Sequence, residues 1–317
     1  MSAEAAEEER MSAVKRIPAT KLLFHSPSHQ QTYEHRTIVS NLLQLKALPE
    51  ADRATFKTPA DVDEDSVFAL FCTSTIFHPQ GGGQPSDVGE IIVNGSHPYV
   101  VITARTSATN PGTVMHFGRF KDQVPSDCIR RSEIVDQKAV QKIDPEKRRL
   151  YSRLHTAGHV LGAATRQLLE DKIENFDELK ASHFPDSAAC EFQGLIEGKW
   201  KGDIQTSVDQ LVKKGAEVRI KWWTKSDFRS RGLERLLIND EDWQAVAVAA
   251  DEDGNEINDA NGKDDEKTRI RVVEIVGTEV YPCGGTHVRT SRECGKVTVR
   301  KIGRSKGSSR VSYNVDV

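Results

Sequence analysis

Four side chains of types that commonly bind metal ions form two pairs with equal spacing. His155 and His159 lie four residues apart in a stretch of helical periodicity, and Cys283 and His287 lie four apart in the glycine-rich segment CGGTH. Residues at this spacing share one helix face, so both imidazoles could reach one ion. The adjacent glycines of CGGTH allow a tight bend that could turn its cysteine and histidine toward one point. Either pair alone is weak evidence, because structural histidines and buried cysteines also occur at such positions.

Together the two pairs supply three histidines and one cysteine, a ligand set that suits zinc. The pairs are separated by 124 residues, from His159 to Cys283, so only a folded domain could join them. We therefore expect one shared Zn2+ site. The ion could be structural in a closed site, or catalytic with a position open to water, and the spacing fits both. The glutamate of the HExxH metalloprotease motif is missing.

A second glycine-rich segment, FHPQGGGQPSDVG at residues 77–89, precedes both pairs in the chain. Three successive glycines let the backbone approach another molecule closely. The segment fits a simple β-turn between two strands. It also fits a loop that contacts the acceptor end of an RNA or the zinc site. It is not a P-loop, because no GK[ST] follows.

The first part of the chain has the composition of a β domain. The segment SVFALFCTSTIF at 66–77 is rich in aromatic and β-branched residues, and 90–93 and 99–104 are further expected strands. Their close spacing predicts a small barrel or sandwich. We expect this β-barrel-like domain at 16–142, with the GGGQ loop inside it, after a disordered acidic tail at 1–15.

The rest of the chain alternates helices and strands, which predicts an α+β zinc-dependent domain at 143–317. Asp144 and Pro145 form a helix-start signal, and apolar residues recur at helical spacing through 146–170. The other expected elements are a helix at 203–214 and strands at 188–192, 217–223, 270–275, 296–302 and 310–315, the last two forming a hairpin. The whole chain is therefore expected to be α+β, with a small β-barrel before the zinc domain.

The formal net charge of −3 conceals a mildly basic body. Residues 1–10 carry a net −3 and the segment 251–267 carries a net −6, which leaves +6 on the remainder. We expect 251–267 to be a solvated acidic loop, and the basic remainder permits a nucleic-acid partner.

The chain has no apolar run of membrane-spanning length and no signal or transit peptide pattern, so we expect a cytoplasmic protein without a membrane partner. Five widely spaced cysteines argue against a disulfide framework.

Taken together, the motifs resemble those of the alanyl-tRNA editing family, the free-standing AlaX proteins and the editing domain of alanyl-tRNA synthetase. The segments that carry the resemblance are TIFHPQGGGQPSDVG (75–89), LHTAGHVLGAA (154–164), YPCGGTHVRT (281–290) and GKVTVRKIGRSKGSSRV (295–311). The resemblance extends from about residue 60 to the C-terminus. An aminoacylation domain would need a much longer chain, so the resemblance implies a free-standing editor with a β-barrel before its zinc domain.

The resemblance implies trans-editing without ATP: hydrolysis of the ester of tRNA(Ala) mischarged with serine, or alternatively with glycine. An alanine pocket cannot strongly reject a substrate that only adds a hydroxyl, so a second site must remove the error. Zinc would bind the aminoacyl group or activate water. Thr75 matches a family threonine whose hydroxyl lies near the substrate, and it also fits an ordinary strand residue. Gln84 is expected to position water or the terminal ribose. The general base stays open, with Asp87 and Asp186 as candidates.

The tRNA(Ala) partner would be bound by basic side chains that neutralise phosphates. The candidates are Lys301, Arg304, Lys306 and Arg310 in the last hairpin, with Arg148, Arg149 and Arg153 beside the zinc helix. Trp222 and Trp223 could stack on a terminal base, but core packing is the favoured interpretation, because adjacent residues of a strand place only one ring on each face.

The chain departs from the family at Gly158, where a larger apolar residue is usual, and at His78 and Gln80, where tyrosine and glutamate are frequent. None of these departures removes an expected metal ligand. Two other functions stay open from the sequence. One is a non-catalytic RNA-binding module stabilised by structural zinc, and the other is a zinc hydrolase that acts on a small ester.

Overall fold

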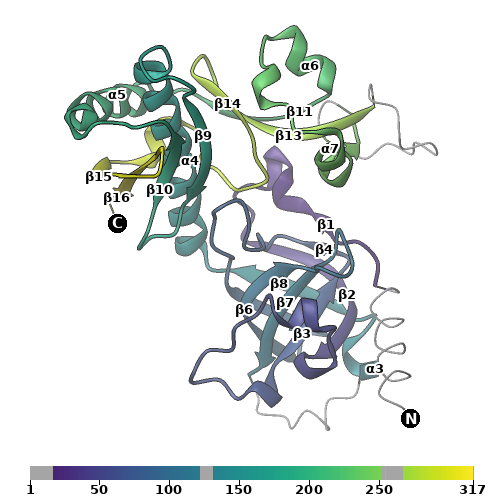
Figure 1. Ribbon diagram of the computed structural model, residues 1–317. Coiled ribbons are helices and arrows are strands. Elements are labelled where there is room, and N and C mark those ends of the chain that lie inside the picture. Colours follow the sequence, from purple (N-terminus) through teal and green to yellow (C-terminus); the bar gives the residue numbers. More distant parts are fainter. Residues whose placement is uncertain (1–16, 122–130, 252–253, 255–266, 317) are drawn as a thin grey trace. The chain divides into compact units, whose positions relative to one another are not determined.

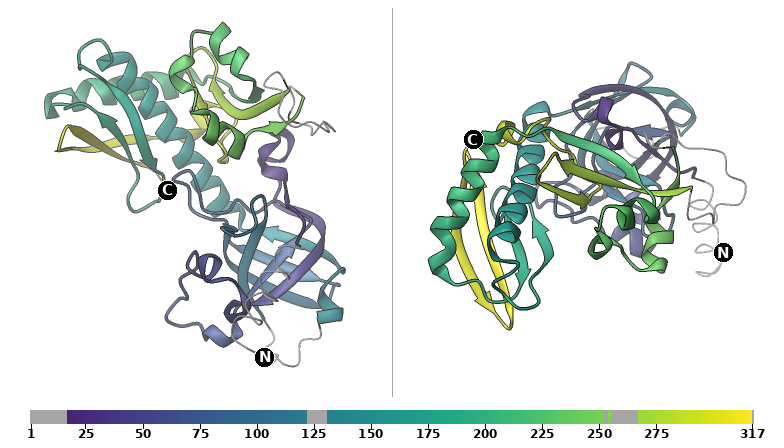
Figure 2. Two further views of the ribbon diagram at one scale, coloured as in Figure 1. Left: turned by 45° about the vertical axis from the view of Figure 1, so that its right-hand side comes forward. Right: turned by 90° about the horizontal axis from the view of Figure 1, so that it is seen from above.

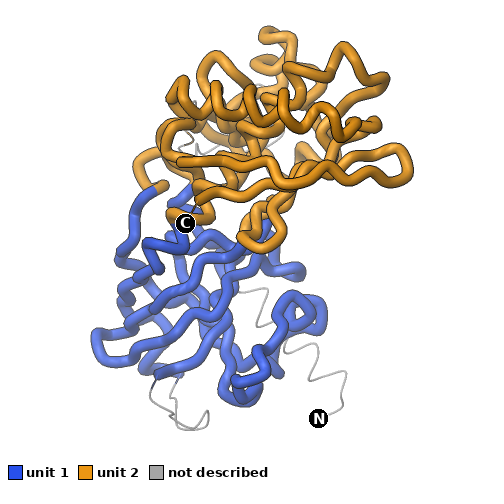
Figure 3. The backbone as a smooth tube through the Cα atoms, turned by 90° about the vertical axis from the view of Figure 1, so that its left-hand side faces the viewer, with its two compact units in different colours: residues 1–24, 31–81, 85–148 blue, residues 25–30, 82–84, 149–317 orange. Residues whose placement is uncertain are grey.

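The chain divides into two compact units in a computed structural model that describes residues 17–121, 131–251, 254 and 267–316. Unit 1 comprises residues 1–24, 31–81 and 85–148, and unit 2 comprises residues 25–30, 82–84 and 149–317 (Figure 3). The expected acidic tail at 1–15 and most of the expected acidic loop at 251–267 lie outside the described residues. Unit 2 therefore includes two short segments from the N-terminal part of the chain.

Unit 1 is built on a closed β-barrel of antiparallel neighbours, which confirms the expected barrel and excludes the sandwich (Figure 1). In barrel order its strands are β2 (Glu34–Gln44), β3 (Phe68–Cys72), β7 (Val114–Phe120), β6 (His97–Thr106), β5 (Gly89–Val93) and β8 (Lys138–Ile143). A short strand β1 (Lys21–Leu22) pairs in parallel with β4 (Ser74–Thr75). Two single-turn α-helices, α2 (Glu50–Arg53) and α3 (Arg131–Ile134), and several short 3-10 turns complete the described elements of this unit.

The barrel is closed around side chains that point inward from alternate strand positions. In β6 the buried residues are Tyr99, Val101 and Ala104. The step of three residues between the last two coincides with a register shift between Val101 and Thr103 in the pairing with β7. An extra residue on one strand shifts the alternation by one position and bends the strand, as barrel closure requires.

Unit 2 places the long helix α4 (Pro145–Leu169), which begins in unit 1, along a four-stranded sheet in both views of Figure 2. The sheet order is β15 (Val297–Ser305), β16 (Ser308–Val315), β10 (Ala189–Gln193) and β9 (Asp177–Ser182). Leu154, Ala157, Leu161 and Ala164 recur at helical spacing and join the core shared with the sheet. Asp144 caps the helix, since its Oδ1 accepts the N–H groups of the second and third residues after it.

A second helix of unit 2, α5 (Lys201–Lys214), packs on the same core through Ile204 and Val208. It ends at Gly215, whose φ of 65° is the left-handed conformation that closes many helices. The expected helix and hairpin of this region are confirmed. The strands β15 and β16 continue almost to the hairpin tip at Lys306 and Gly307, where both residues have positive φ.

A second sheet in unit 2 supports the cysteine-containing loop. Its strands are β11 (Val218–Trp223), β13 (Thr268–Ile275) and β12 (Val248–Ala249), with β14 (Glu279–Pro282) also paired to β13. Two helices, α6 (Lys225–Ser230) and α7 (Asp240–Val246), cover a small core that includes Trp223. Trp222 and Trp223 are 8% and 6% exposed, so both are buried in the protein and neither is presented for base stacking.

None of the helices in the described residues has the length and apolar character needed to cross a bilayer.

Candidate metal centre

The helix α4 contributes the first pair of candidate ligands. His155 and His159 are one turn apart, and their rings lie 4.9 Å apart between centroids, so both imidazoles leave the same helix face. His155 is buried and His159 is partly exposed. The position of this pair on the helix agrees with the expectation from sequence.

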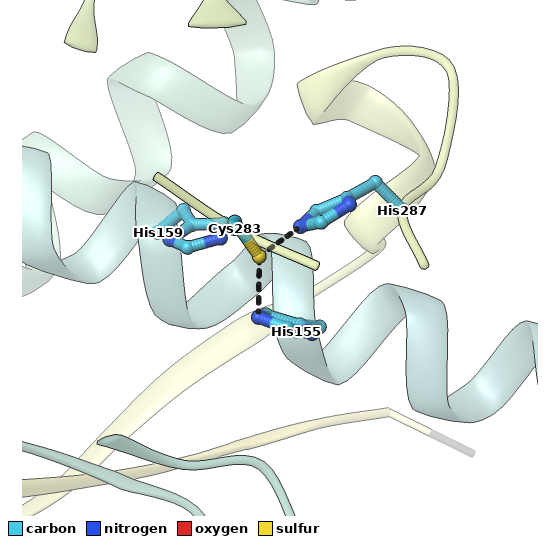
Figure 4. A group of neighbouring side chains, drawn as sticks. All are labelled: His155, His159, Cys283 and His287. Atoms are coloured by element: carbon cyan, nitrogen blue, oxygen red, sulfur yellow. Dashed lines mark hydrogen bonds between the residues drawn. The ribbon is translucent and has the colours of Figure 1, made fainter. Parts of the chain in front are cut away.

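The loop after β14 contributes the second pair. Its start is fixed by β13, because the Cys283 N–H donates to the Arg271 carbonyl at 3.1 Å. The loop then passes so close to His155 that a Cβ added at Gly285 would lie 2.2 Å from His155 Cε1. Only a glycine allows the chain to approach the ring at this distance. The close approach brings Cys283 and His287 to the histidines of the helix (Figure 4).

The four side chains offer donor atoms that all lie within 4.8 Å of one another. Cys283 Sγ lies 3.3 Å from His155 Nε2 and 3.6 Å from His287 Nε2. Among the described residues, no hydrogen-bond partner exists for His159 Nε2, which is buried. An unsatisfied buried nitrogen beside a thiol and two imidazoles is what a tetrahedral zinc site would use. The residues present therefore fit a zinc ion.

The GGGQ segment supports the first ligand. Gln84 is fully buried, and its Oε1 lies 2.7 Å from His155 Nδ1. Because an amide oxygen only accepts hydrogen bonds, Nδ1 carries the proton and Nε2 keeps the lone pair for a metal. The same Oε1 accepts the Thr286 N–H at 3.0 Å, and Gln84 Nε2 donates to Thr286 Oγ1 at 2.8 Å. Gln84 therefore joins a ligand of the helix to the loop that carries the other two.

The loop has two further supports. The His287 N–H donates to Gln30 Oε1 at 2.8 Å, and the Thr286 hydroxyl lies 2.7 Å from Ser152 Oγ on α4. Gln30 belongs to the segment 25–30 that joins unit 2. Outer contacts of this kind orient ligands before a metal binds.

The electrostatic surroundings favour neutral histidines. Burial, reinforced by the positive charge of Arg271, holds the pKa of His159 well below its usual value. Burial raises the pKa of the Cys283 thiol, while Arg271 and the Gly285 N–H oppose that rise. A bound zinc would deprotonate the thiol outright. Arg271 itself is 6% exposed and donates to the carbonyls of His25 and Cys283, and burial lowers its pKa to about 10.

Thr75 lies in β4 of unit 1 and is fully buried. Its hydroxyl is 2.8 Å from His116 Nε2, and it accepts the Phe77 N–H at 3.0 Å. His116 Nδ1 lies 2.9 Å from the Leu70 carbonyl, which can only accept, so Nε2 is the acceptor for Thr75. Burial lowers the pKa of His116 to about 4. The hydroxyl proton of Thr75 is therefore engaged inside the barrel unit.

The expected contact of Arg148 with tRNA is wrong. Its side chain is 1% exposed, and its Nε donates to both carboxylate oxygens of Asp87 at 3.0 and 3.1 Å. A buried guanidinium paired with a buried carboxylate cannot neutralise a phosphate. Asp87, a candidate general base, is occupied by this pair and by the His78 N–H at 2.6 Å. The other candidate base, Asp186, is exposed.

The other basic candidates divide by exposure. Lys301, Arg304 and Lys306 are exposed near the tip of the last hairpin, and Arg149 is exposed on α4. Arg310 is exposed but pairs with Glu191 at 2.9 Å. Arg153 is half-buried, donates to the Cys294 carbonyl and pairs with Asp316. Among the described residues, the expected basic residues that are exposed and outside the ion pairs given above are therefore Lys301, Arg304 and Lys306 of the hairpin and Arg149 of α4.

Sequence reasoning missed several residues that contact the candidate ligands or their loop, among them Gln30, His183 and Arg271. None of these three has a histidine or cysteine three or four residues away in the sequence. His183 is 2% exposed, and its ring stacks on that of His155. No local pattern could have pointed to these residues, because their roles arise from contacts across the fold.

Comparison with known proteins gives consistent matches. Residues 270–312, which include Cys283 and His287, match the family described as the threonyl and alanyl tRNA synthetase second additional domain. The chain is 26% identical over 309 residues to an alanine–tRNA ligase of Methanosphaera stadtmanae, covering 94% of this chain and 27% of the ligase. It is 25% identical over 240 residues to the alanyl-tRNA editing protein AlaX-L of Pyrococcus horikoshii, covering 75% of this chain and 49% of that protein. The chain thus spans about a quarter of the ligase and about half of the editing protein.

Proposed function

Because this chain belongs to the alanyl-tRNA editing family, we propose that it hydrolyses the ester bond of tRNA(Ala) charged with a wrong amino acid, acting in trans. The observation that carries the proposal is the convergence of His155, His159, Cys283 and His287 within 4.8 Å. Such a donor set suits Zn2+. The reaction class is aminoacyl-tRNA deacylation.

When bound, Zn2+ supplies a Lewis acid for the ester carbonyl or lowers the pKa of a coordinated water. The chain's own residues orient the ligands. Gln84 holds His155 in the tautomer that offers Nε2, and it holds the loop through Thr286. We propose Gln84 as a positioning residue, since its amide oxygen already has two partners. His159 and Cys283 are partly exposed as residues, while the Nε2 atom of His159 is buried.

We propose serine as the amino acid that is removed, with glycine as the alternative. An alanine-selecting site cannot exclude serine well, because serine adds one hydroxyl to a similar shape. Discrimination at the editing site would then need a polar contact to that hydroxyl. Thr75 stays a candidate for this contact, although its proton is donated to His116. A substrate hydroxyl would have to donate to Thr75 Oγ1 or replace its bond to His116.

The exposed residues of the last hairpin are proposed to contact the tRNA backbone. Lys301, Arg304 and Lys306 carry no counter-charge within ion-pair distance among the described residues. Each phosphate contact removed should lower the salt dependence of binding by about one unit of slope. Alanine at all three positions should therefore weaken tRNA binding most at low salt and leave zinc binding unchanged.

The deciding experiment measures deacylation of Ser-tRNA(Ala), Gly-tRNA(Ala) and Ala-tRNA(Ala) by the zinc-loaded protein. Cys283→Ala removes a ligand, and Cys294→Ala is the matched control, because Cys294 is a buried cysteine outside the donor set. We expect the wild type and Cys294→Ala to clear the seryl ester and spare the alanyl ester, and Cys283→Ala to clear neither. A folded, zinc-loaded wild type that clears no mischarged ester would refute the proposal.

A further inference from the structure

His183 lies between β9 and β10 and is the third histidine ring against His155, besides His159 and His287. The centroids of the His183 and His155 rings are 4.1 Å apart, and their planes differ by 23°. His183 is 2% exposed and does not belong to the four-residue donor set. A stacked ring at this distance restricts rotation of His155 out of its own plane.

His183 is itself held from two sides. Its Nδ1 lies 2.7 Å from the Tyr313 hydroxyl, and that hydroxyl donates to the Leu154 carbonyl at 2.9 Å. A hydroxyl has one proton, so His183 must donate from Nδ1 to Tyr313. The His183 backbone N–H donates to the Gly83 carbonyl at 2.8 Å. Gly83 directly precedes Gln84, whose side-chain oxygen accepts the Nδ1 proton of His155.

The space for this arrangement exists because α4 has a glycine between its two histidines. A Cβ added at Gly158 would lie 2.4 Å from His183 Cε1, 2.6 Å from His183 Nδ1 and 2.8 Å from the Tyr313 hydroxyl oxygen. Real Cβ atoms do not approach other atoms this closely. Glycine is a poor residue for a helix interior, so its presence here has a packing reason. Because Gly158 has no side chain, His183 and Tyr313 can pack directly against α4.

We propose that His183 is a positioning residue of the metal centre, anchored by Tyr313 and admitted by Gly158. The hydrogen bond from His155 Nδ1 to Gln84 restricts rotation of the imidazole within its own plane. The stacked His183 ring restricts tilting of that plane. The two contacts together aim His155 Nε2 at the point shared with Cys283 and His287. The inference rests on the proposed metal centre and concerns ligand orientation, so it does not depend on which ester is hydrolysed.

The test measures metal binding and ligand geometry directly. Zinc affinity is determined by competition with a chromophoric chelator, and the visible absorption bands of the cobalt-loaded protein report the coordination geometry. We expect His183→Ala to weaken zinc binding about 10-fold to 100-fold, the range for outer contacts of ligands, and to shift the cobalt bands. His183→Phe keeps a ring against His155 and loses only the bond to Tyr313, so its bands should stay closer to those of the wild type.

The role of Gly158 is tested by a double-mutant comparison. Gly158→Ala should weaken zinc binding in the wild type and cause little further loss in the His183→Ala/Tyr313→Phe background, where the clashing atoms are gone. Gly202→Ala in α5 is the control, because a Cβ there meets no atom within 4 Å. It should leave zinc binding unchanged.

Three outcomes distinguish the positioning role of His183 from the proposed metal centre and from the proposed deacylase function. Wild-type zinc affinity and cobalt bands in His183→Ala, whatever its thermal stability, overturn the positioning role. A wild type that binds neither zinc nor cobalt overturns the metal centre and this inference together. Retained effects of His183 on metal binding in a protein that deacylates nothing support the inference and refute only the proposed function.

Discussion

Replacing Gly285 by alanine tests how closely the cysteine loop packs against its histidine partner. A Cβ at this position would lie 2.2 Å from His155 Cε1 and 2.9 Å from Gln84 Oε1, whereas ordinary contact begins at 3.4 Å. The loop or the ring must therefore move by the difference of about 1.2 Å. Zinc–ligand distances tolerate changes of only about 0.2 Å. We expect Gly285→Ala to detach a ligand and to weaken zinc binding at least about 100-fold, or about 2.8 kcal/mol.

The assay is chelator competition on protein whose folding has been verified by circular dichroism. Gly284→Ala is the matched control, because a Cβ there would have only His25 Nε2 at 3.6 Å as its nearest neighbour. Neither glycine has a positive φ, so alanine strains neither backbone and the two variants differ in contacts alone. Wild-type affinity in Gly285→Ala, or an equal loss in both variants, would show that the loop does not pack on His155 as described.

Other perturbations have equally definite outcomes. Gln84→Ala should weaken zinc binding about 10-fold to 100-fold, because His155 loses the acceptor for its Nδ1 proton; unchanged affinity would remove the positioning role of Gln84. Asp87→Asn should lower the free energy of unfolding in urea by about 3–5 kcal/mol, because it leaves the Arg148 charge buried and uncompensated. Asp65→Asn is its control, since the Asp65 pair with Lys46 is exposed and should contribute less than about 1 kcal/mol; similar losses in the two variants would contradict the burial argument. Burial lowers the pKa of His116 from its ordinary value of 6.5 to about 4, so the stability contributed by this buried neutral ring is fully present above pH 6.5 and is lost as the pH falls through 4. His116→Gln, whose amide can keep both polar contacts, should lose less stability than the wild type across this pH range in urea unfolding, and an identical pH dependence would refute the assignment.

The four candidate metal ligands could be predicted from sequence because each pair is local. His155 and His159 are related by one helical turn, and Cys283 and His287 by one glycine-rich loop, so each spacing has a direct geometric meaning. The barrel strands β5 and β6 were also predictable, because each contains a run of apolar and β-branched residues (IIV and YVVIT) between turn residues. Local sequence features therefore predicted the fold class and the candidate donor set.

The surroundings of the ligands could not be predicted in this way. Arg148 follows the capped start of a helix and has the sequence context of a surface cation, yet its partner Asp87 is 61 residues away. Gln84 and Thr286 are 202 residues apart, and Gln30 and His287 are 257 apart. Contacts of this separation depend on how the whole chain folds, and a single sequence has no period or spacing that reports them.

The composition of unit 2 limits how this protein can be divided. Residues 25–30 and 82–84 belong to the unit that holds the donor set, and they supply Gln30 and Gln84. A recombinant fragment of residues 149–317 would contain all four candidate ligands and would still leave the N–H groups of Thr286 and His287 without their acceptors. Such a fragment should bind zinc more weakly than the full chain. Adding the separate 17–148 segment in trans should recover part of the affinity, because the candidate metal centre depends on residues far outside the stretch that contains its four candidate ligands.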